Sequence, residues 1–170
     1  IYTTLGLMSG TSMDGIDASI IHSDGENEYE PVFDKYFEYN NELYKDLTDL
    51  RDKISSTEDL KSLSEIIKST EKKITLFHVK AVKDVMKEKK LDLDLIGFHG
   101  QTIFHSANEK ISKQLGDGNL LSSLTKKTVV YNFRKNDLAN GGQGAPLTPV
   151  FHQLIVNQGN FEFPVIILNI

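Results

Sequence analysis

IYTTLGLMSGTSMDGIDASIIH, residues 1–22, contains two runs of strand-forming residues on either side of a polar bend. Residues 1–8 carry large apolar side chains and predict a buried strand, and residues 16–22 predict a second one. The segment between them, Ser9–Gly15, is rich in glycine and small polar residues, which is typical of a tight turn. The chain is therefore expected to begin with two strands joined by a short loop.

A third strand is predicted next, before the pattern becomes helical. Residues 31–39 alternate apolar and polar side chains, and Asp24-Gly25 before them is a turn signal. Three successive strands with tight links predict an antiparallel meander. Apolar residues three or four positions apart then predict helices over residues 43–54 and from Thr57 to Lys90, the second being long enough for a break.

The rest of the chain alternates between predicted strands and helices. Strands are predicted at residues 94–98 and 128–133, and helices at residues 120–124 and 146–157, the last with Pro146 near its start. A meander followed by strand–helix alternation indicates an α/β fold. We expect a mixed sheet with helices on both faces.

Composition argues against several classes of protein. The 170 residues carry 19 basic and 24 acidic side chains, a net charge of −5, whereas nucleic-acid-binding proteins usually have a basic surplus. No run approaches the roughly 20 apolar residues that span a bilayer, and no signal-peptide pattern is visible. The absence of cysteine excludes disulfides and thiolate zinc sites and is compatible with a reducing compartment. We expect a cytoplasmic protein with neither a nucleic-acid nor a membrane partner.

The last residues have the composition of a buried strand. FPVIILNI, residues 163–170, is an apolar run of strand formers. An unpaired apolar strand is an aggregation hazard, so we expect the natural protein to continue past Ile170. We predict one domain over residues 1–160 and the first strand of a second domain over residues 161–170.

The bend between the first two strands has the composition of an anion-binding loop. Glycine lets the backbone approach a ligand closely, and successive N–H groups in such a turn form a concave anion site. Asp14 disfavours bare phosphate but suits Mg²⁺ held through water. The Gly-Lys-Ser/Thr ending of a Walker A loop is absent, and a plain hairpin turn is an equally weighted alternative. The candidate phosphate-binding residues are Ser9, Gly10, Thr11, Ser12, Met13, Asp14 and Gly15.

A second group of candidates follows the strand predicted at residues 94–98. Ligands bind beside the carboxyl ends of strands in open α/β sheets. His99, Gln101 and Thr102 are therefore candidates for binding the hydroxyl, amide or carboxylate groups of a sugar. The alternative is a buried His99 with a structural role at the strand end. A metal pair of His99 with His105 is disfavoured because no third ligand has suitable spacing.

A third group follows the strand predicted at residues 128–133. Arg134 offers a fork that matches a carboxylate or a phosphate. Asp137 lies in the same polar segment, and Gln143 lies on the glycine-rich segment that leads into the next helix. The alternative is a salt bridge between Arg134 and Asp137 that braces this loop.

Asp117 is a fourth, weaker candidate. It lies in the sequence QLGDGN, residues 114–119, before a predicted helix. It is interpreted either as part of a plain turn or as a group that orients a ligand or Mg²⁺, with equal weight. All four groups fall at strand ends or in turns, which favours one composite site.

Four motifs, in order, resemble the anhydro-N-acetylmuramic acid kinase family. They are LMSGTSMDGID at residues 7–17, GFHGQTIFH at residues 97–105, QLGDGN at residues 114–119, and FRKNDLANGGQGAPLTPVFH at residues 133–152. Any one of them alone is weak, but four in family order across nearly the whole chain are highly specific. The resemblance implies a ribonuclease H-like domain of the actin-like sugar kinase and heat-shock ATPase superfamily.

The resemblance also implies a reaction and a set of site residues. The family uses ATP and Mg²⁺ to open 1,6-anhydro-N-acetylmuramic acid with water and to form N-acetylmuramic acid 6-phosphate, in cell-wall sugar recycling. Ser9–Gly15 would bind the ATP phosphates, and the general base, an aspartate, would lie beyond Ile170. A homodimer is kept open. The residues implied for the sugar side are His99, Gln101, Thr102, Arg134, Asp137 and Gln143.

One departure and two alternatives bear on this implication. The family usually has aspartate immediately before the Phe-Arg pair, whereas this chain has Asn132. One alternative is a related sugar or acetate-type kinase with another acceptor. The other is a non-catalytic nucleotide-binding module of actin-like fold. If the second domain is required for catalysis, residues 1–170 alone are expected to be inactive.

Overall fold

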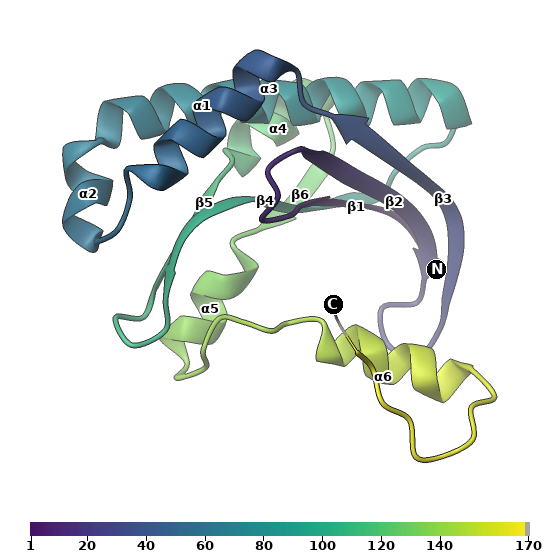
Figure 1. Cartoon of the computed structure of the whole chain (residues 1–170). Coiled ribbons are helices and arrows are strands. Elements are labelled where there is room, and N and C mark those ends of the chain that lie inside the picture. The colour runs from purple at the N-terminus through teal and green to yellow at the C-terminus, as the bar shows by residue number, and fades with distance from the viewer. Residues whose placement is uncertain (169–170) are drawn as a thin grey trace.

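A six-stranded mixed sheet forms the centre of the molecule (Figure 1). The structure is a computed structural model that describes residues 1–168 of the chain. The strands lie in the order β3-β2-β1-β4-β5, and β6 pairs with β4. They are β1 (Tyr2–Ser9), β2 (Gly15–Ser23), β3 (Tyr29–Glu38), β4 (Leu95–Ser106), β5 (Ile111–Leu115) and β6 (Thr128–Tyr131).

The first three strands form the predicted antiparallel meander. Thr4 faces Ile21 across β1 and β2, and Ile16 faces Phe37 across β2 and β3. The large buried residues of β1 and β2 lie at every second position, as a sheet with one face in the core requires. The meander prediction is confirmed.

β4 is longer than predicted and joins the two halves of the sheet. Its first half runs parallel to β1 and β6, with Phe98 aligned to Leu7 on one side and to Tyr131 on the other. Its second half turns into an antiparallel hairpin with β5. The prediction ended this strand at Phe98 because the following segment is polar. That boundary was wrong, because pairing with β5 keeps the polar segment extended.

The helices agree with the predicted periodicity, except around residue 133. The break expected within residues 57–90 falls at Leu63. No helix was predicted at residues 133–139, and the predicted strand included Phe133. These residues form a helix because β6 ends at Tyr131 and Asn132 adopts a left-handed backbone. The helices are α1 (Asn41–Asp52), α2 (Thr57–Ser62), α3 (Ser64–Lys89), α4 (Gly118–Thr125), α5 (Phe133–Ala139) and α6 (Pro149–Gln158).

The main core lies between the sheet and the helices drawn above it in Figure 1, namely α1, α3 and α4. Leu5 and Ile96 of the sheet and Ile74 of α3 are completely buried there. Burying a side chain of this size stabilises the fold by about 1.5–3 kcal/mol. This layer fixes the sheet and therefore the loops that leave its edge.

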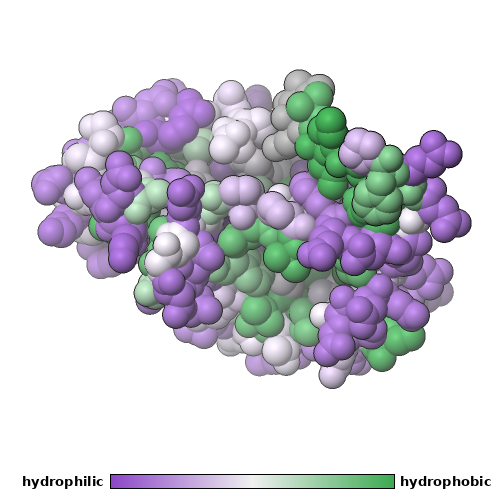
Figure 2. Space-filling model, turned by 90° about the horizontal axis from the view of Figure 1, so that it is seen from below, coloured by the Kyte–Doolittle hydropathy of each residue, from purple (hydrophilic) through white to green (hydrophobic). Residues whose placement is uncertain are grey.

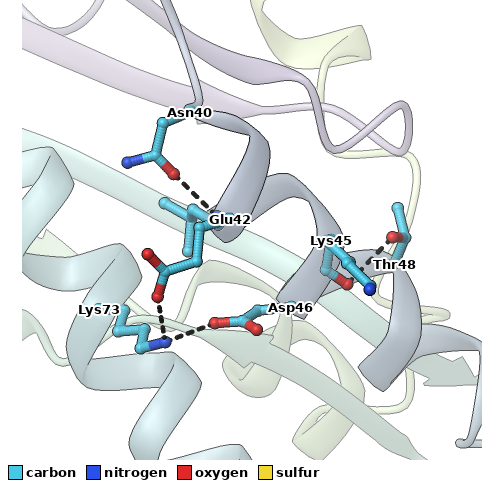
Figure 3. Close-up of polar contacts among 7 residues, drawn as sticks. Asn40, Glu42, Lys45, Asp46, Thr48 and Lys73 are labelled. Carbon is cyan, nitrogen blue, oxygen red and sulfur yellow. Dashed lines mark hydrogen bonds and ion pairs between the residues drawn. The ribbon is translucent and has the colours of Figure 1, made fainter.

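Helix α1 is attached to α3 mainly through apolar contacts. Its core-facing residues are Leu43, Leu47 and Leu50, all buried. Figure 3 shows the polar fringe of this contact, where Lys73 of α3 lies 3.1 Å from Glu42 and 2.6 Å from Asp46. Such half-exposed ion pairs contribute only about 0–1 kcal/mol. The apolar stripe therefore determines where α1 lies.

The opposite face of the sheet is more open. Helix α6 lies across it (Figure 1) and has no fully buried residue. The helix is held by Tyr29, whose ring lies 4.9 Å from that of Phe151 and whose backbone exchanges two hydrogen bonds with the Gln158 amide. Figure 2 views the molecule from this side and shows apolar side chains gathered in the middle with polar ones around them. Helices thus cover both faces, but unequally.

The C-terminal segment does not pair with the sheet. No strand is assigned over residues 161–168, and residues 169–170 lie outside the described part. A strand forms only when its backbone hydrogen-bonds to a neighbouring strand. None of the six strands described pairs with this segment. That it opens a second domain stays a prediction. Within residues 1–168, no helix is both long and apolar enough to cross a membrane.

Candidate functional site

Three of the predicted site segments leave the sheet at the same edge. β1, β6 and the first half of β4 are parallel, so their carboxyl ends point the same way. The loop Ser9–Gly15 follows β1, residues 99–102 lie at the end of the parallel part of β4, and α5 follows β6. The topology therefore gathers these segments at one edge, where α/β sheets place their ligands.

The base of the loop Ser9–Gly15 is closed by Ser9. This residue is 2 % exposed, and its hydroxyl lies 2.9 Å from the Gly15 carbonyl oxygen, 2.8 Å from the Tyr39 hydroxyl and 2.6 Å from Oε1 of Gln101. Tyr39 also donates its backbone N–H to the Asp14 carbonyl. The loop is thus held by the residue that follows β3 and by β4, as well as by its own strands.

Met13 anchors the middle of the loop. It adopts a left-handed backbone with φ of 58°, its side chain is 1 % exposed, and its N–H donates to the Gly10 carbonyl. Its side chain therefore belongs to the core. Any contribution of Met13 to anion binding would come from the shape that it gives the backbone.

The outer side of the loop presents donors and one carboxylate. Thr11, Ser12 and Asp14 are exposed, and within residues 1–168 the N–H groups of Thr11 and Ser12 donate no hydrogen bond. The Ser12 hydroxyl donates to Asp14 at 2.6 Å and lowers the pKa of that carboxyl, so Asp14 is ionised at neutral pH. These free N–H groups can donate to a phosphate, and Mg²⁺ bound with the phosphate would offset the repulsion between the phosphate and the Asp14 carboxylate.

The loop fits a cation whose ligands are mostly water molecules and substrate phosphates rather than protein side chains. Over residues 1–168, no group of three or more His, Cys, Asp or Glu side chains could hold a metal ion. Mg²⁺ usually keeps several waters and is bound through one or two carboxylates plus substrate phosphates. Asp14 as a single carboxylate agrees with that mode.

Gln101 lies beneath the loop. The side chain is fully buried, accepts from Ser9, and donates from Nε2 to the Gly10 carbonyl at 2.8 Å. The neighbouring Thr102 accepts from Gln114 of β5. Sugar binding by Gln101 and Thr102 stays a prediction, and the geometry favours a role for Gln101 in shaping the loop.

His99 and Arg134 form the second part of the site. The His99 ring donates from Nδ1 to the Gly100 carbonyl at 2.8 Å and accepts at Nε2 from Nε of Arg134 at 3.0 Å. Burial, and then the Arg134 cation, lower the pKa of His99. The ring is therefore neutral at pH 7 with its proton on Nδ1.

The predicted brace of the glycine-rich loop runs through Gly144. Arg134 donates from its guanidinium to the Gly144 carbonyl at 2.8 Å, and Asp137 accepts from the Gly144 N–H at 2.7 Å. Among the described residues these two side chains form no direct ion pair. The predicted salt bridge is therefore not formed, and the two side chains instead contact the same residue, Gly144, at its carbonyl and at its N–H. Gln143, next to Gly144, is exposed.

Asp117 has a clear local role. Its carboxylate accepts from the Leu120 N–H at 2.9 Å and caps the N-terminus of α4. Its own N–H donates to Thr75 of α3. The plain-turn interpretation therefore accounts for Asp117, and its role toward Mg²⁺ stays a prediction without support from this geometry.

Two contributors to the site were not identified from the sequence. Tyr39 and Gly144 hold the two loops, yet Tyr39 appears only as the last apolar residue of a strand and Gly144 as one of several loop glycines. The left-handed φ of 72° at Gly144 and its contact with Leu138 explain why glycine stands there. The roles of Tyr39 and Gly144 depend on residues far along the chain and on backbone angles, which the sequence pattern does not record.

The contact between Arg134 and His99 predicts a measurable pKa shift. Replacing Arg134 with methionine is expected to raise the pKa of His99, because a cation that disfavours protonation is removed. A pH titration of the His99 ring by NMR measures the shift. Lys135→Met is the control, since Lys135 is exposed and does not contact the ring. An unchanged pKa in Arg134→Met would contradict the contact.

Comparison with known proteins gives one consistent result. The family model described as anhydro-N-acetylmuramic acid kinase matches residues 2–170. A protein of Pelagibacter ubique named anhydro-N-acetylmuramic acid kinase is 65 % identical over 169 residues, which is 99 % of this chain and 45 % of that protein. A protein of the same name from Agrobacterium fabrum is 40 % identical and covers 100 % of this chain and 47 % of its own length.

A third relative has a similar coverage. The protein of that name from Brucella canis is 39 % identical over 175 residues, covering 98 % of this chain and 46 % of its own length. The chain therefore spans about half the length of the relatives that it matches.

Proposed function

The chain belongs to the anhydro-N-acetylmuramic acid kinase family, and from this premise we propose that the full-length protein is an ATP-dependent kinase that hydrolytically opens 1,6-anhydro-N-acetylmuramic acid. Water attacks the anomeric carbon and loses a proton to a base, the bond from that carbon to the bridging oxygen breaks, and this oxygen takes the γ-phosphoryl group. The products are N-acetylmuramic acid 6-phosphate and ADP. The reaction would serve cell-wall sugar recycling in the cytoplasm.

One observation of the structure carries the proposal furthest. The loop Ser9–Gly15 offers the free N–H groups of Thr11 and Ser12 beside the ionised Asp14, at the edge where the other site segments meet. We propose that these amides and hydroxyls bind the ATP phosphates. Asp14 would hold Mg²⁺ through water, and the cation when bound would neutralise charge on the transferring phosphoryl group.

The sugar is proposed to lie against His99 and Arg134. Arg134 has five N–H donors, of which the described contacts use only two. A remaining pair suits the carboxylate of a muramic acid, which a planar fork can bind through two parallel hydrogen bonds. Gln143 is exposed on the braced loop beside it and is proposed as an outer contact of the same sugar.

Several broader features of the enzyme belong to the same proposal. The meander followed by the parallel strands β4 and β6 supports a ribonuclease H-like assignment of the domain. We propose that a second domain supplies the general base, because phosphoryl transfer requires groups positioned on both sides of a closed cleft.

A homodimer is a further proposal for the full-length protein. Measuring the mass of that protein in solution tests it.

A coupled assay of ADP release on the full-length protein tests the function. Turnover with 1,6-anhydro-N-acetylmuramic acid is expected, with none on ordinary hexoses or acetate. Turnover only on another acceptor would favour the related-kinase alternative. Nucleotide binding without any turnover would favour a non-catalytic module.

Asp14 gives a sharper test of the phosphate loop. Asp14→Asn in the full-length protein is expected to reduce kcat/KM for Mg-ATP by about 10-fold or more, since one charged contact to the cation is lost. The melting temperature should be almost unchanged, because the side chain is exposed. Asp49→Asn removes the same charge from the exposed side of α1 and is the control. A large loss of stability with normal use of ATP would instead support a plain hairpin turn.

A further inference from the structure

We propose that Gln101 is a positioning residue that turns the Thr11 N–H of the phosphate loop toward the nucleotide. This inference rests on the proposed function, because it concerns the same loop. It assigns Gln101 a different task from the sugar contact predicted from the sequence. Three observations carry it: the burial of Gln101, the direction of its hydrogen bonds, and the geometry of the peptide that it holds.

Gln101 is not accessible to a ligand. Its exposed fraction is 0 %, and both ends of its amide are engaged. Ser9 and Tyr39, which continue the network, are 2 % and 4 % exposed. A buried polar network of this kind rigidifies what it contacts when all its members are satisfied.

The direction of the hydrogen bonds is fixed by chemistry. The Gly10 carbonyl only accepts, so the nitrogen of the Gln101 amide must face it and the amide oxygen must face Ser9. Ser9 has one proton, and Oε1 of Gln101 at 2.6 Å and the Gly15 carbonyl oxygen at 2.9 Å both accept it, the closer contact being to Gln101. Ser9 therefore has no proton for Tyr39, and Tyr39 donates to Ser9. Burial raises the pKa of the Tyr39 hydroxyl, which therefore keeps its proton. The order of donation is Tyr39, Ser9, Gln101, Gly10.

The last hydrogen bond of this series, from Gln101 to Gly10, orients a group that faces the ligand. In a planar trans peptide the carbonyl and the following N–H point in opposite directions. Gln101 holds the Gly10 carbonyl inward, toward the base of the loop. The Thr11 N–H is therefore turned outward, where Thr11 and Ser12 are exposed and the amides have no partner among residues 1–168. Without Gln101, among the residues described only the Met13 N–H, which lies within the loop itself and 3.2 Å away, would hold the Gly10 carbonyl. The peptide would then be less firmly oriented, and the Thr11 N–H could turn away from the phosphates.

The position of Gln101 depends on the irregular start of the second half of β4. The register between β1 and β4 shifts between Leu7 and Ser9, so Ser9 is aligned with Gln101 rather than with the preceding residue. Gly100 at this shift has a left-handed φ of 71°. The irregularity brings Gln101 beneath the loop and leaves His99 in contact with Arg134.

Two variants of the full-length protein separate positioning from general stability. Gln101→Leu removes both hydrogen bonds with little change in size. Gln101→Glu keeps the acceptor for Ser9, but it can donate to Gly10 only when the carboxyl is protonated. Gln114→Leu is the matched control, because within residues 1–168 the Gln114 side chain bonds only to Thr102 and Ser112 on the same sheet. Affinity for a non-hydrolysable ATP analogue with Mg²⁺ is measured by calorimetry from pH 8 to pH 5 and divided by the wild-type affinity at each pH.

Gln101→Leu and, at pH 8, Gln101→Glu are expected to bind the analogue about tenfold more weakly than wild type, as loss of one oriented donor implies. The relative affinity of Gln101→Glu should recover as the pH falls, and that of Gln101→Leu should not. KM for ATP should rise in both variants while KM for the sugar stays near the wild-type value. Gln114→Leu should match wild type.

The failures of this inference and of the proposed function are distinguishable. Wild-type affinity for the analogue in both Gln101 variants, or a rise only in KM for the sugar, would overturn the positioning role and leave the kinase proposal intact. Absence of recovery at low pH in a folded Gln101→Glu protein would also overturn it. A wild-type protein that binds no nucleotide would remove both proposals together.

Discussion

Replacing Gly100 with alanine is expected to lower the free energy of unfolding by about 3 kcal/mol, a large fraction of the stability of a domain. Gly100 has a left-handed φ of 71°, and a Cβ atom there would lie 2.3 Å from the Leu115 carbonyl oxygen. That neighbour is backbone of β5, so relief of the clash requires the two strands to separate. Chemical denaturation of the full-length protein, followed through the transition that includes this domain, measures the loss.

Gly25 provides the matched control. It also has a left-handed backbone, with φ of 85°, but a Cβ atom there would meet nothing within 4 Å. Gly25→Ala is expected to lower stability by only about 1–2 kcal/mol, the cost of the left-handed conformation alone. Equal losses in the two variants would show that the contact with β5 does not matter.

Gly100→Ala should also weaken nucleotide binding more than its effect on stability suggests. The residue lies between His99, which contacts Arg134, and Gln101, which holds the phosphate loop. A displaced strand moves both side chains at once. Affinity for the ATP analogue, measured well below the melting temperature, should therefore fall in Gly100→Ala and stay at the wild-type value in Gly25→Ala.

His78 is expected to make the protein less stable as the pH falls from 6.5 toward 4. This residue of α3 is fully buried, donates from Nδ1 to the Ile74 carbonyl, and has no partner for Nε2 among the described residues. Burial lowers the pKa of His78 from 6.5 to about 4. Because the folded pKa is the lower one, the unfolded chain binds more protons between these values, and stability is fully present only above pH 6.5. The loss over the whole window is about 3 kcal/mol.

His78→Leu tests this assignment. Leucine has a similar volume and cannot be protonated, so the variant should lack this part of the pH dependence. The free energy of unfolding of wild type minus that of the variant, measured from pH 7.5 to pH 4, should fall by about 3 kcal/mol. Carboxylates titrate equally in both proteins and cancel in the difference. Parallel pH profiles would show that His78 does not control the loss.

The sequence determined the layout of the fold because it depends on local patterns. Alternating apolar residues specified the three-strand meander, and helical spacing specified α1 and α3. Side-chain periods of 2 and 3.6 residues follow from backbone geometry and need no partner to be recognised. The four motifs likewise marked the loops that could bind a ligand, because glycine and small polar residues at strand ends are local features.

The boundaries that failed depend on neighbours instead. β4 was ended too early because its second half is held extended only by β5. The helix at residues 133–139 was not predicted, and the strand prediction ran on to Phe133, because only the left-handed Asn132, with φ of 61°, ends the strand and lets the chain turn into a helix. Both outcomes are set by pairing and backbone turns that the side-chain pattern does not record.

Within the site, the sequence determined which residue types were available and the tertiary structure decided what each one contacts. Gln101 is a polar residue in a motif that also contains His99, and from the sequence both face the same ligand. A register shift and the left-handed Gly100 instead place Gln101 under the loop, while His99 contacts Arg134. The hydrogen bond between Gln101 and Ser9, 92 positions apart, requires the parallel pairing of β1 and β4, which exists only once the sheet is assembled.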